Sequence, residues 1–493
     1  MTLLNSDRML WLDSIAGHAK SIPNRVAIRK ICHTSGTVHN TTYGELEERS
    51  SHAAAVLQGL VPPGGSVLIC LPNGPEFLLA LIGAFKAGLP VLPVSTASTA
   101  HELQEITQVV GASVFIRSED ALPRIDEPGV HEIDIESLCR EPARPIGGPR
   151  ATPSLMLRTS GTTGMPKVVS RDLHALDDVA ENLKEALQLT VSDLVLALVP
   201  MCHSYGIEHC VLAPLHAGAE IVSVQGIDSA PIHALIADVR ATVFPGFPFA
   251  YERILEETKD PIAPSLRLAY SAGSQLPESV SDRFSQQFGI TLGQLYGSTE
   301  VGSVLFNDPH TSKLKSESVG FALPDVHVLI LDPENPDLEA PLVDGNEGQL
   351  AVRSSTMLSH YVGQKMNDML EGYFLTGDLA VRGSCGSITI TGRLKHQVDI
   401  AGAKVNPLEV EATILQMDGI SECLVVPCVV RGTLKRLRAL LVTQPERTPP
   451  SVSEIKQHLR SRLSAYKVPR IYEFRTKLPR TPLGKIIRTE KEL

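Results

Sequence analysis

Short apolar runs alternate with helical patterns through the first half of the chain. The runs that predict buried strands lie at residues 67–71, 91–94, 155–157, 195–199, 221–224 and 243–244. Between them apolar residues recur at helical spacing, as at 42–60, where a Thr-x-x-Glu capping box opens the segment. Strands that alternate with helices in this way are typical of parallel sheets covered by helices on both faces. The pattern therefore predicts an α/β fold.

The pattern changes after Gly320, where helical segments become fewer. Apolar runs at 326–331, 349–352 and 387–391 predict the strands of a more β-rich subdomain. A small α/β pattern of its own follows, with strands at 424–426 and 439–442 and a helix at 453–463. We predict a large domain at 1–394, built of parallel-rich sheets with flanking helices and the β-rich subdomain. A small, mobile α+β lid domain would follow at 395–493, with its hinge near Lys395.

Charge restricts the partners of the protein. The 493 residues include 45 Lys and Arg and 55 Asp and Glu, a formal net charge of −10, which argues against a protein that binds nucleic acid over its whole surface. The charge is uneven, because residues 396–493 carry a net +7 and the rest a net −17. A basic module on an acidic body suits a lid that closes over a polyanion, although a solvated imbalance without function would look the same.

Cysteines and apolar stretches bear on the compartment. Eight cysteines without a C-x-x-C pair predict free thiols in a reducing compartment, hence a cytoplasmic protein, and no disulfide frame or zinc site. No basic segment followed by a long apolar run opens the sequence, so no secretory signal is expected. The most apolar stretch, 77–94, is interrupted by a lysine, glycines and two prolines. It predicts a buried helix and strand and no membrane span.

The strongest chemical signal is a loop rich in glycine and hydroxyl groups after the apolar run at 155–157. It reads TSGTTGMPK, and its candidate anion-binding residues are Thr159, Ser160, Gly161, Thr162, Thr163, Gly164 and Lys167. Glycines let backbone N–H groups converge on an anion, hydroxyls add donors, and the lysine supplies positive charge for terminal phosphates. A flexible linker would explain the glycines but not the terminal lysine. The spacing is not that of a Walker A loop, which disfavours a P-loop kinase but not nucleotide binding.

Three further motifs carry groups that nucleotide chemistry needs. Residues 296–300 (YGSTE) place a carboxylate beside a hydroxyl, a pair that suits Mg²⁺ and a phosphate oxygen. Residues 373–378 (YFLTGD) offer a carboxylate after a tight turn, suited to a ribose diol. Residues 479–485 (PRTPLGK) contain prolines and a glycine that fix the backbone, so that Lys485 can project from it. Each motif alone is weak.

Together and in this order, the motifs resemble those of the adenylate-forming superfamily: acyl-CoA synthetases, non-ribosomal peptide adenylation domains and firefly-type luciferases. The resemblance runs from residues 42–46 (TYGEL) to Lys485 and is closest to a stand-alone acid–CoA ligase. It implies ATP-dependent activation of a hydrophobic carboxylic acid to an acyl-adenylate, with Mg²⁺ and release of pyrophosphate. The acyl group then passes to a thiol, most often that of coenzyme A.

The resemblance also implies roles for residues of the nucleotide site. The loop at 159–167 would hold the β- and γ-phosphates, and Tyr296 would stack on the adenine. Thr299 would touch the α-phosphate, and Glu300 would bind Mg²⁺. The other nucleotide-site residues that it implies are Gly273, Ser274, Gln275, Gly297 and Ser298, with Asp378 and Arg393 on the ribose hydroxyls.

Catalysis and acid binding would fall to a second group of residues. Lys485 matches the lysine that contacts the substrate carboxylate and the α-phosphate, and Lys395 falls at the hinge. His203 matches a residue near the acyl pocket, although without the resemblance it would be taken for a packed core histidine. The candidate acid pocket consists of His203, Tyr205, Phe247, Ala272, Gly273 and Val301. Tyr205, Phe247 and Val301 could instead belong to the core.

The chemistry supports these roles independently. Attack of a carboxylate on the α-phosphate brings two anions together, so positive charge must lie where the transition state forms. Magnesium at Glu300 and the ammonium group of Lys485 can supply it. The acyl-adenylate is reactive, so water must be excluded, and a basic C-terminal domain can do this and then rotate about Lys395 to admit the acceptor.

The acceptor and the acid stay open. Residues 400–402 (IAG) lack the Lys or Ser that the family often has before this glycine, near the thiol tunnel. A separate carrier protein or a free amine is therefore an alternative to coenzyme A as acceptor, and an alkyl chain and an aryl ring both suit the acid. A non-catalytic nucleotide sensor on the same fold is the alternative from a different class of protein.

Overall fold

The computed structural model describes most of the chain. The described residues are 11–32, 35–118, 127–140, 153–159, 167–225, 230–311, 317–394, 398–400, 403–431, 434–444, 447–463, 467–480 and 486–488. They fall into two compact units. The first comprises the chain up to 316 with 320–327 and 353–372, and the second comprises 317–319, 328–352 and the chain from 373 onward.

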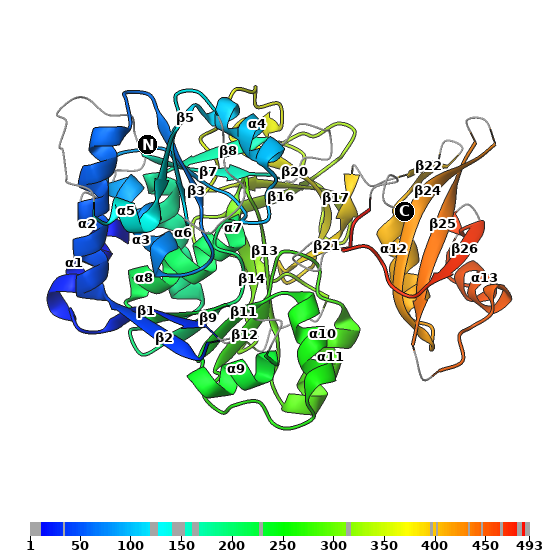
Figure 1. Ribbon diagram of the computed structural model, residues 1–493. Coiled ribbons are helices and arrows are strands. Elements are labelled where there is room, and N and C mark those ends of the chain that lie inside the picture. The colour runs from blue at the N-terminus through cyan, green and yellow to red at the C-terminus, as the bar shows by residue number, and fades with distance from the viewer. Residues whose placement is uncertain are drawn as a thin grey trace. The chain divides into compact units, whose positions relative to one another are not determined.

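Two sheets form the frame of the first unit (Figure 1). The nine-stranded sheet has the order β15 (Phe321–Ala322), β14 (Gly302–Asn307), β13 (Gly293–Ser298), β12 (Leu268–Ser271), β11 (Val243–Gly246), β9 (Leu194–Ala197), β10 (Glu220–Gln225), β1 (Val26–Cys32), β2 (Thr37–Thr42). The seven-stranded sheet has the order β18 (His360–Tyr361), β8 (Val168–Asp172), β7 (Ser154–Arg158), β4 (Val91–Pro93), β3 (Ser66–Cys70), β5 (Ala112–Arg117), β6 (His131–Asp134). Neighbouring strands from β13 through β1, and from β7 through β6, run parallel. The predicted parallel-rich α/β architecture is confirmed.

Helices connect these strands. They are α1 (Trp11–Ser21), α2 (Tyr43–Leu60), α3 (Pro75–Lys86), α4 (Ala100–Val110), α5 (Ile135–Leu138), α6 (Leu173–Ala186), α7 (Ser204–Ile207), the π-helix η1 (Glu208–Leu212), α8 (Ala213–Ala217), α9 (Ile232–Val239), α10 (Pro248–Glu257) and α11 (Glu278–Phe288). The predicted capping box opens α2, since the Thr42 hydroxyl accepts from the Glu45 N–H at 3.2 Å and the Glu45 carboxylate accepts from the Thr42 N–H at 2.8 Å. These two bonds satisfy N–H groups that a helix end leaves without a partner.

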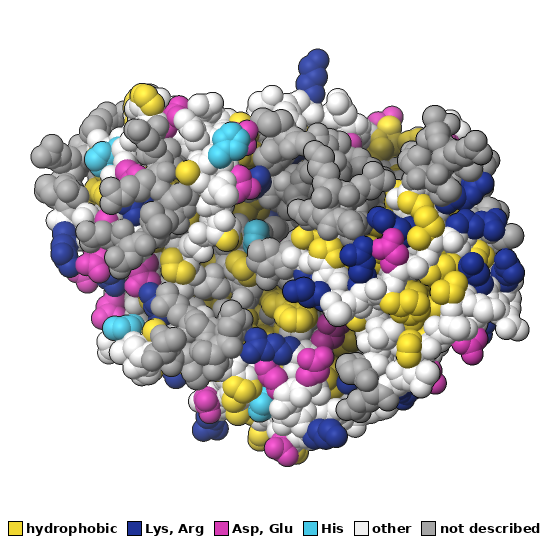
Figure 2. Space-filling view, turned by 45° about the vertical axis from the view of Figure 1, so that its right-hand side comes forward, with side chains coloured by type: hydrophobic (Ala, Val, Ile, Leu, Met, Phe, Trp, Pro, Cys, Tyr) yellow, Lys and Arg dark blue, Asp and Glu magenta, His cyan; other side chains and the backbone are white. Residues whose placement is uncertain are grey.

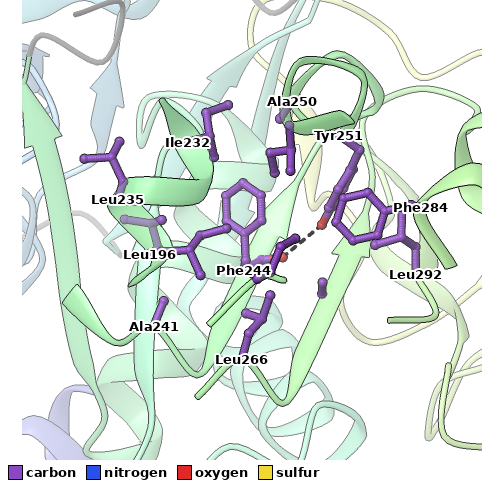
Figure 3. Close-up of a cluster of buried hydrophobic side chains, with 14 of the residues drawn as sticks. Leu196, Ile232, Leu235, Ala241, Phe244, Ala250, Tyr251, Leu266, Phe284 and Leu292 are labelled. Carbon is purple, nitrogen blue, oxygen red and sulfur yellow. Dashed lines mark hydrogen bonds between the residues drawn. The ribbon is translucent and has the colours of Figure 1, made fainter. Parts of the chain in front are cut away.

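A large apolar cluster packs α9, α10 and α11 against the strands of the nine-stranded sheet (Figure 3). Phe244, Tyr251 and Phe284 lie at its centre and are fully buried or nearly so. The Tyr251 and Phe284 rings meet edge to face at 5.2 Å, and the Tyr251 hydroxyl donates to the Tyr270 carbonyl at 2.8 Å. Each such side chain contributes roughly 1.5–3 kcal/mol through burial. This packing fixes the strands whose ends carry the candidate site.

In its described residues, the second unit contains three groups of paired strands and two helices. One group has the order β16 (His327–Leu331), β17 (Glu347–Arg353), β20 (Tyr373–Arg382), β21 (Ile388–Arg393). The C-terminal part contains β22 (Val398–Ile400), β23 (Ala403–Val405), α12 (Pro407–Leu415), β24 (Ile420–Arg431), β25 (Leu434–Thr443), α13 (Val452–Arg460) and β26 (Ile471–Arg475). The chain also forms a short strand β19 (Met369–Leu370). β24 and β25 extend well beyond the predicted apolar runs, because their pairing continues over polar residues.

The predicted domain boundary stays a prediction. Residues 395–397, which include the hinge residue Lys395, lie outside the described residues. Within the described ranges, no helix has both the length and the apolar character needed to cross a bilayer. On the face that Figure 2 shows, charged side chains of both signs lie among hydrophobic ones.

Candidate active site

Two candidate pocket residues, Tyr205 and Ala272, meet at the carboxyl ends of β11 and β12. Gly246 ends β11 and lies opposite Ser271, which ends β12. The Gly246 carbonyl accepts a hydrogen bond from the Tyr205 hydroxyl at 2.8 Å and from the Ala272 N–H at 3.3 Å. Ligands of parallel α/β sheets bind outside the carboxyl ends of the strands. The parallel order of the strands therefore brings Tyr205 and Ala272 to the edge where a substrate is expected.

The turn between β13 and β14 carries Thr299 and Glu300 at the same edge. Ser298 and Gly302 face each other across it. The turn is held by the Leu358 N–H, which donates to the Glu300 carbonyl at 2.7 Å, and by the Thr356 hydroxyl, which donates to the Val301 carbonyl at 2.7 Å. With its backbone fixed in this way, the turn presents one hydroxyl and one carboxylate at a defined place.

Lys167, at the end of the candidate phosphate loop, contacts two side chains. Its Nζ is 3.2 Å from Asp368 Oδ2 and lies over the Tyr361 ring, 4.6 Å from the centroid. Burial, and then the charges of Glu300 and Asp368, raise the pKa of Tyr361 well above its usual value. The same loop begins at Thr159, whose N–H donates to the Lys167 carbonyl at 2.9 Å. The structure thus brings Lys167 and Glu300 into one neighbourhood around Tyr361.

The other candidates of the first unit lie at ends of strands or helices. His203 precedes α7 and is exposed, and Phe247 precedes α10 and is half-buried. Gly273, Ser274 and Gln275 are exposed after β12, and Gly273 has a φ of +82° that favours glycine. Half-buried Tyr296 lies on β13, next to Gly297, where a Cβ would come 2.3 Å from the Gly302 carbonyl oxygen. Val301 is fully buried.

In the second unit, Asp378 and Arg393 are cross-strand neighbours on β20 and β21. The Arg393 guanidinium donates to both carboxylate oxygens of Asp378, which is 3% exposed. The two residues predicted to bind the ribose are therefore paired with each other. Asp378 lies inside a strand and not after a tight turn, and the positive φ of +70° at Gly377 accounts for the turn-like sequence.

Some candidates lie outside the described residues: Ser160, Gly161, Thr162, Thr163, Gly164, Lys395 and Lys485. Within the described ranges, no group of three or more His, Cys, Asp or Glu side chains could hold a metal ion. A carboxylate such as Glu300 suits an ion whose other ligands are phosphate oxygens and water.

The sequence did not point to Tyr361 and Asp368. They lie about 200 residues from Lys167, and the pairing of β18 with β8 brings Tyr361 opposite Val169. A buried ion pair, Arg171 with Glu208, was also missed. A signal for it existed, because Glu208 stands in the apolar segment 206–212 (GIEHCVL) and a charge there needs a partner.

Comparison with known proteins agrees with this geometry. The model of the AMP-binding enzyme family matches residues 15–362, and that of the AMP-binding enzyme C-terminal domain matches 409–485. 4-Coumarate–CoA ligase 1 of Oryza sativa subsp. japonica is 27% identical, over 91% of this chain and 86% of its own. The long-chain-fatty-acid–CoA ligase FadD13 of Mycobacterium tuberculosis is 26% identical, over 91% of this chain and 92% of its own.

A solved structure shares the fold. The o-succinylbenzoate CoA synthetase MenE of Bacillus subtilis, in complex with an acyl-adenylate intermediate, superposes with a TM-score of 0.83 at 22% identity, over 97% of each chain. The chain belongs to the AMP-binding enzyme family. This membership and the relatives confirm the predicted AMP-forming acid–thiol ligase, with ATP and coenzyme A as substrates.

Proposed function

We propose that this ligase activates a carboxylic acid whose tail is uncharged and hydrophobic. The carboxylate attacks the α-phosphorus of ATP, so that an acyl–O–P bond forms and pyrophosphate leaves. The single observation that carries the proposal is the meeting of Tyr205, Gly246 and Ala272 at the same sheet edge as the Thr299–Glu300 turn. An acid bound beside Tyr205 would direct its carboxylate toward a phosphate held by that turn.

The electrostatics around Tyr205 support an uncharged tail. Its ring lies 4.8 Å from that of His209, and burial lowers the pKa of His209 to about 4, so this imidazole is neutral at pH 7. The charge of the preceding residue, Glu208, is balanced by that of Arg171. Both 4-coumarate and long-chain fatty acids, the acids named for the two relatives, have tails without charge. An aryl and an alkyl acid are therefore both consistent with the site.

Each part of the nucleotide has its own set of predicted binding residues. We assign the triphosphate to the loop at 159–167, the adenine to Tyr296 with Gly273, Ser274 and Gln275, and the ribose to Asp378 and Arg393. Thr299 would donate to the α-phosphate, and the carboxylate of Glu300 would hold Mg²⁺. Bound there, Mg²⁺ supplies positive charge at the phosphate oxygens. Lys485 would place its ammonium group between the substrate carboxylate and the α-phosphate.

The second step would transfer the acyl group to the thiol of coenzyme A. The sulfur attacks the acyl carbon, the C–O bond to AMP breaks, and the thiol proton is released. We propose that the C-terminal domain closes for the first step and turns near Lys395 for the second. A carrier protein and a free amine remain the competing acceptors. All eight cysteines are free thiols, which supports a reducing, cytoplasmic setting.

Pyrophosphate exchange tests the first step. Incubation with ATP, radiolabelled pyrophosphate and single acids from an aryl and alkyl panel should label ATP with at least one acid, and the full reaction should yield AMP. Formation of ADP instead of AMP would contradict the proposal, and nucleotide binding without exchange for any acid would favour the sensor. Mass spectrometry of reactions with coenzyme A, amines or a carrier protein then identifies the acceptor.

A further inference from the structure

A buried ionic network lies beside the candidate site. Arg171 is 0% and Glu208 1% exposed, and Arg171 Nη1 donates to Glu208 Oε1 at 2.5 Å. The Ser204 hydroxyl donates to the same oxygen at 2.8 Å. The other carboxylate oxygen, Oε2, accepts from the N–H and the hydroxyl of Ser303, at 2.9 and 2.6 Å. Glu208 thus accepts four hydrogen bonds.

The direction of every bond follows from Glu208 being ionised. Burial alone would raise its pKa, but the charge of Arg171 and the hydrogen bonds lower it by more. An ionised carboxylate only accepts, so the Ser303 hydroxyl must donate to it and accept from His209 Nε2, at 2.9 Å. The neutral His209 then accepts at Nδ1 from the Tyr270 hydroxyl, at 2.8 Å. From Tyr270 through His209 and Ser303 to Glu208, each group therefore donates a hydrogen bond to the next.

Each partner of Glu208 belongs to a different substrate-binding segment. Arg171 lies on β8, the strand that follows Lys167 and the phosphate loop. Ser204 lies between the candidate pocket residues His203 and Tyr205. Ser303 lies three residues after Glu300, at the start of β14. One carboxylate therefore joins the segments assigned to the phosphates, to the acid and to the metal ion.

The network is a poor choice for stability alone. An apolar group in place of a buried ion pair is often as stable or more so, because removing two charges from water is costly. In addition, Arg171 Nε and Nη2 have no partner among the described residues. Gly302, with a φ of +74°, leaves room for the guanidinium, since a Cβ there would lie 2.8 Å from Nη2. The turn and the arginine fit each other closely.

We propose that Arg171 and Glu208 are positioning residues for adenylation: they hold the Thr299–Glu300 turn and the Ser204 segment in register with the strand behind the phosphate loop. We infer this on the basis of the proposed function, which assigns those segments to the reactants. A displacement of the turn by about 1 Å would misalign the phosphate that Thr299 contacts and slow the chemical step.

The test compares R171M/E208L with a matched control, R267M/D193L. The control removes another arginine–carboxylate pair, which lies at the opposite ends of the strands. Kinetics of pyrophosphate exchange, with the best acid of the panel, give kcat per active site and KM for ATP, and thermal unfolding gives Tm. We expect kcat to fall ~10–100-fold in R171M/E208L, whereas KM for ATP should stay within about threefold of the wild-type value. The control should have the kcat of the wild type. The single variant R171K should keep most of the wild-type kcat, because it retains the cation and Glu208.

Two results would overturn the proposal: a folded R171M/E208L with an unchanged kcat, or an equal loss of kcat in the control. If R171M/E208L does not fold, S303A replaces it, since it removes one hydroxyl and keeps both charges. It should lower kcat ~3–10-fold and also lower Tm somewhat, because the buried His209 Nε2 loses its acceptor. An unchanged kcat overturns the proposal.

The proposed function can fail separately, if the wild type exchanges pyrophosphate with no acid. Amide hydrogen exchange then still tests the positioning role. It should accelerate at residues 299–303 in S303A and not in R267M/D193L, and unchanged protection at 299–303 would contradict the proposal.

Discussion

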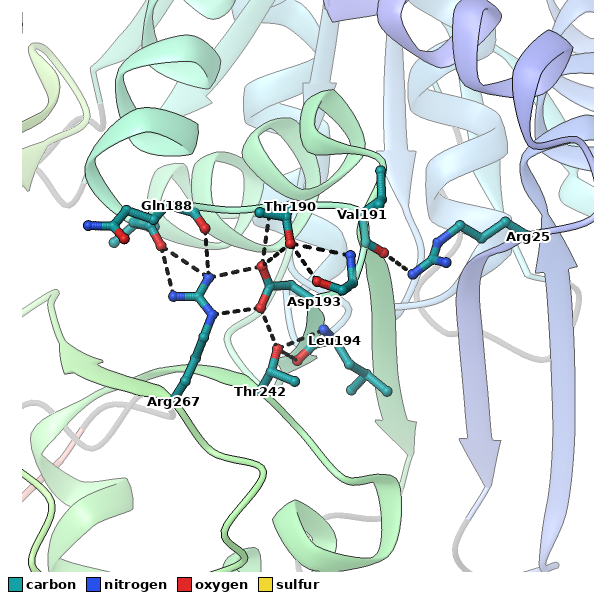
Figure 4. A network of polar contacts seen from close by, with 10 residues as sticks. Arg25, Gln188, Thr190, Val191, Asp193, Leu194, Thr242 and Arg267 are labelled. Atoms are coloured by element: carbon teal, nitrogen blue, oxygen red, sulfur yellow. Dashed lines mark hydrogen bonds and ion pairs between the residues drawn. The ribbon is translucent and has the colours of Figure 1, made fainter.

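Two ion pairs lie near opposite ends of the parallel strands of the nine-stranded sheet. Asp193 directly precedes β9, and its partner Arg267 directly precedes β12. The Asp193 carboxylate also accepts from the Thr242 hydroxyl, directly before β11, at 2.8 Å and from the Thr190 N–H at 2.8 Å (Figure 4). This network ties the starts of three strands together. The Arg171–Glu208 network instead lies at the carboxyl end, where the candidate site is.

The two arginines differ in how completely they are satisfied. Arg267 is partly exposed and donates to the carbonyls of Leu187 and Gln188 as well as to Asp193. Arg171 is fully buried and leaves two nitrogens without a partner among the described residues. The pair at the amino ends is therefore built for stability. The pair at the carboxyl ends sacrifices some stability, which is typical of a group that a site requires.

Removing each carboxylate alone should give the largest contrast. Glu208→Ala leaves the fully buried Arg171 without its counter-ion and should cost about 3–5 kcal/mol of the free energy of unfolding. Asp193→Ala should cost about 1–3 kcal/mol, because Arg267 keeps its carbonyl partners and reaches water. Urea unfolding of both variants measures the difference. Equal losses would show that burial does not distinguish the two pairs.

Lys485→Ala should separate chemistry from folding. Loss of one transition-state charge should lower adenylation ~10²–10³-fold. Tm should stay close to that of the wild type, unlike in the Glu208 variant. Thioester formation from preformed acyl-adenylate, measured with coenzyme A, should be spared. An equal loss in both half-reactions would refute the role assigned to Lys485.

Of the two networks, only the one at the carboxyl ends should contribute to the change in stability between pH 7 and 5. Burial lowers the pKa of His209 to about 4, whereas an unfolded histidine titrates near ~6.5. Only the unfolded chain takes up this proton between those values, so the contribution of His209 is complete above ~6.5 and is lost as pH falls toward 4. Between pH 6.5 and 5 the loss is about 2 kcal/mol.

Asp193 should respond only at lower pH. Burial raises its pKa, but hydrogen bonds from Arg267, Thr242 and Thr190 lower it by more, to a value below the usual one. Its contribution is therefore present above the pKa of an unfolded aspartate, about 4, and is lost as pH falls through its lower folded value.

Because other histidines also titrate, the prediction for His209 is tested by the difference in urea unfolding between wild type and His209→Gln at pH 7 and 5. If wild type and His209→Gln lose the same stability between pH 7 and 5, His209 is not the source of that loss.

Features that depend on neighbouring residues were more predictable from the sequence than contacts between distant residues. Apolar runs gave the parallel strands, and the capping box at Thr42 gave the start of α2, because both depend on neighbours in sequence. The resemblance implied a common ribose role for Asp378 and Arg393 but not their ion pair, which follows from the antiparallel register of β20 and β21. The partners of Glu208 and of Lys167 were not predictable. Arg171, Ser303 and Tyr361 come from strands whose adjacency depends on sheet order, which one sequence does not specify.

A pair of glycines should give the smallest and most local contrast. Gly289, after α11, and Gly302, after the Thr299–Glu300 turn, both have positive φ, +68° and +74°. Alanine at either position should cost about 1–2 kcal/mol through backbone strain. At 289 the new Cβ would meet nothing within 4 Å, but at 302 it would lie 2.8 Å from Arg171 Nη2. Gly302→Ala should therefore cost about 1 kcal/mol more, because the buried guanidinium must move.

That extra cost should also appear in activity. Movement of Arg171 loosens Glu208 and with it Ser303, so pyrophosphate exchange should slow in Gly302→Ala and stay unchanged in Gly289→Ala. Urea unfolding and exchange kinetics of the two variants separate strain from the arginine contact. If both variants lose the same stability and neither loses activity, the turn tolerates displacement of Arg171, and the carboxyl-end pair would be as purely structural as the pair at the amino ends.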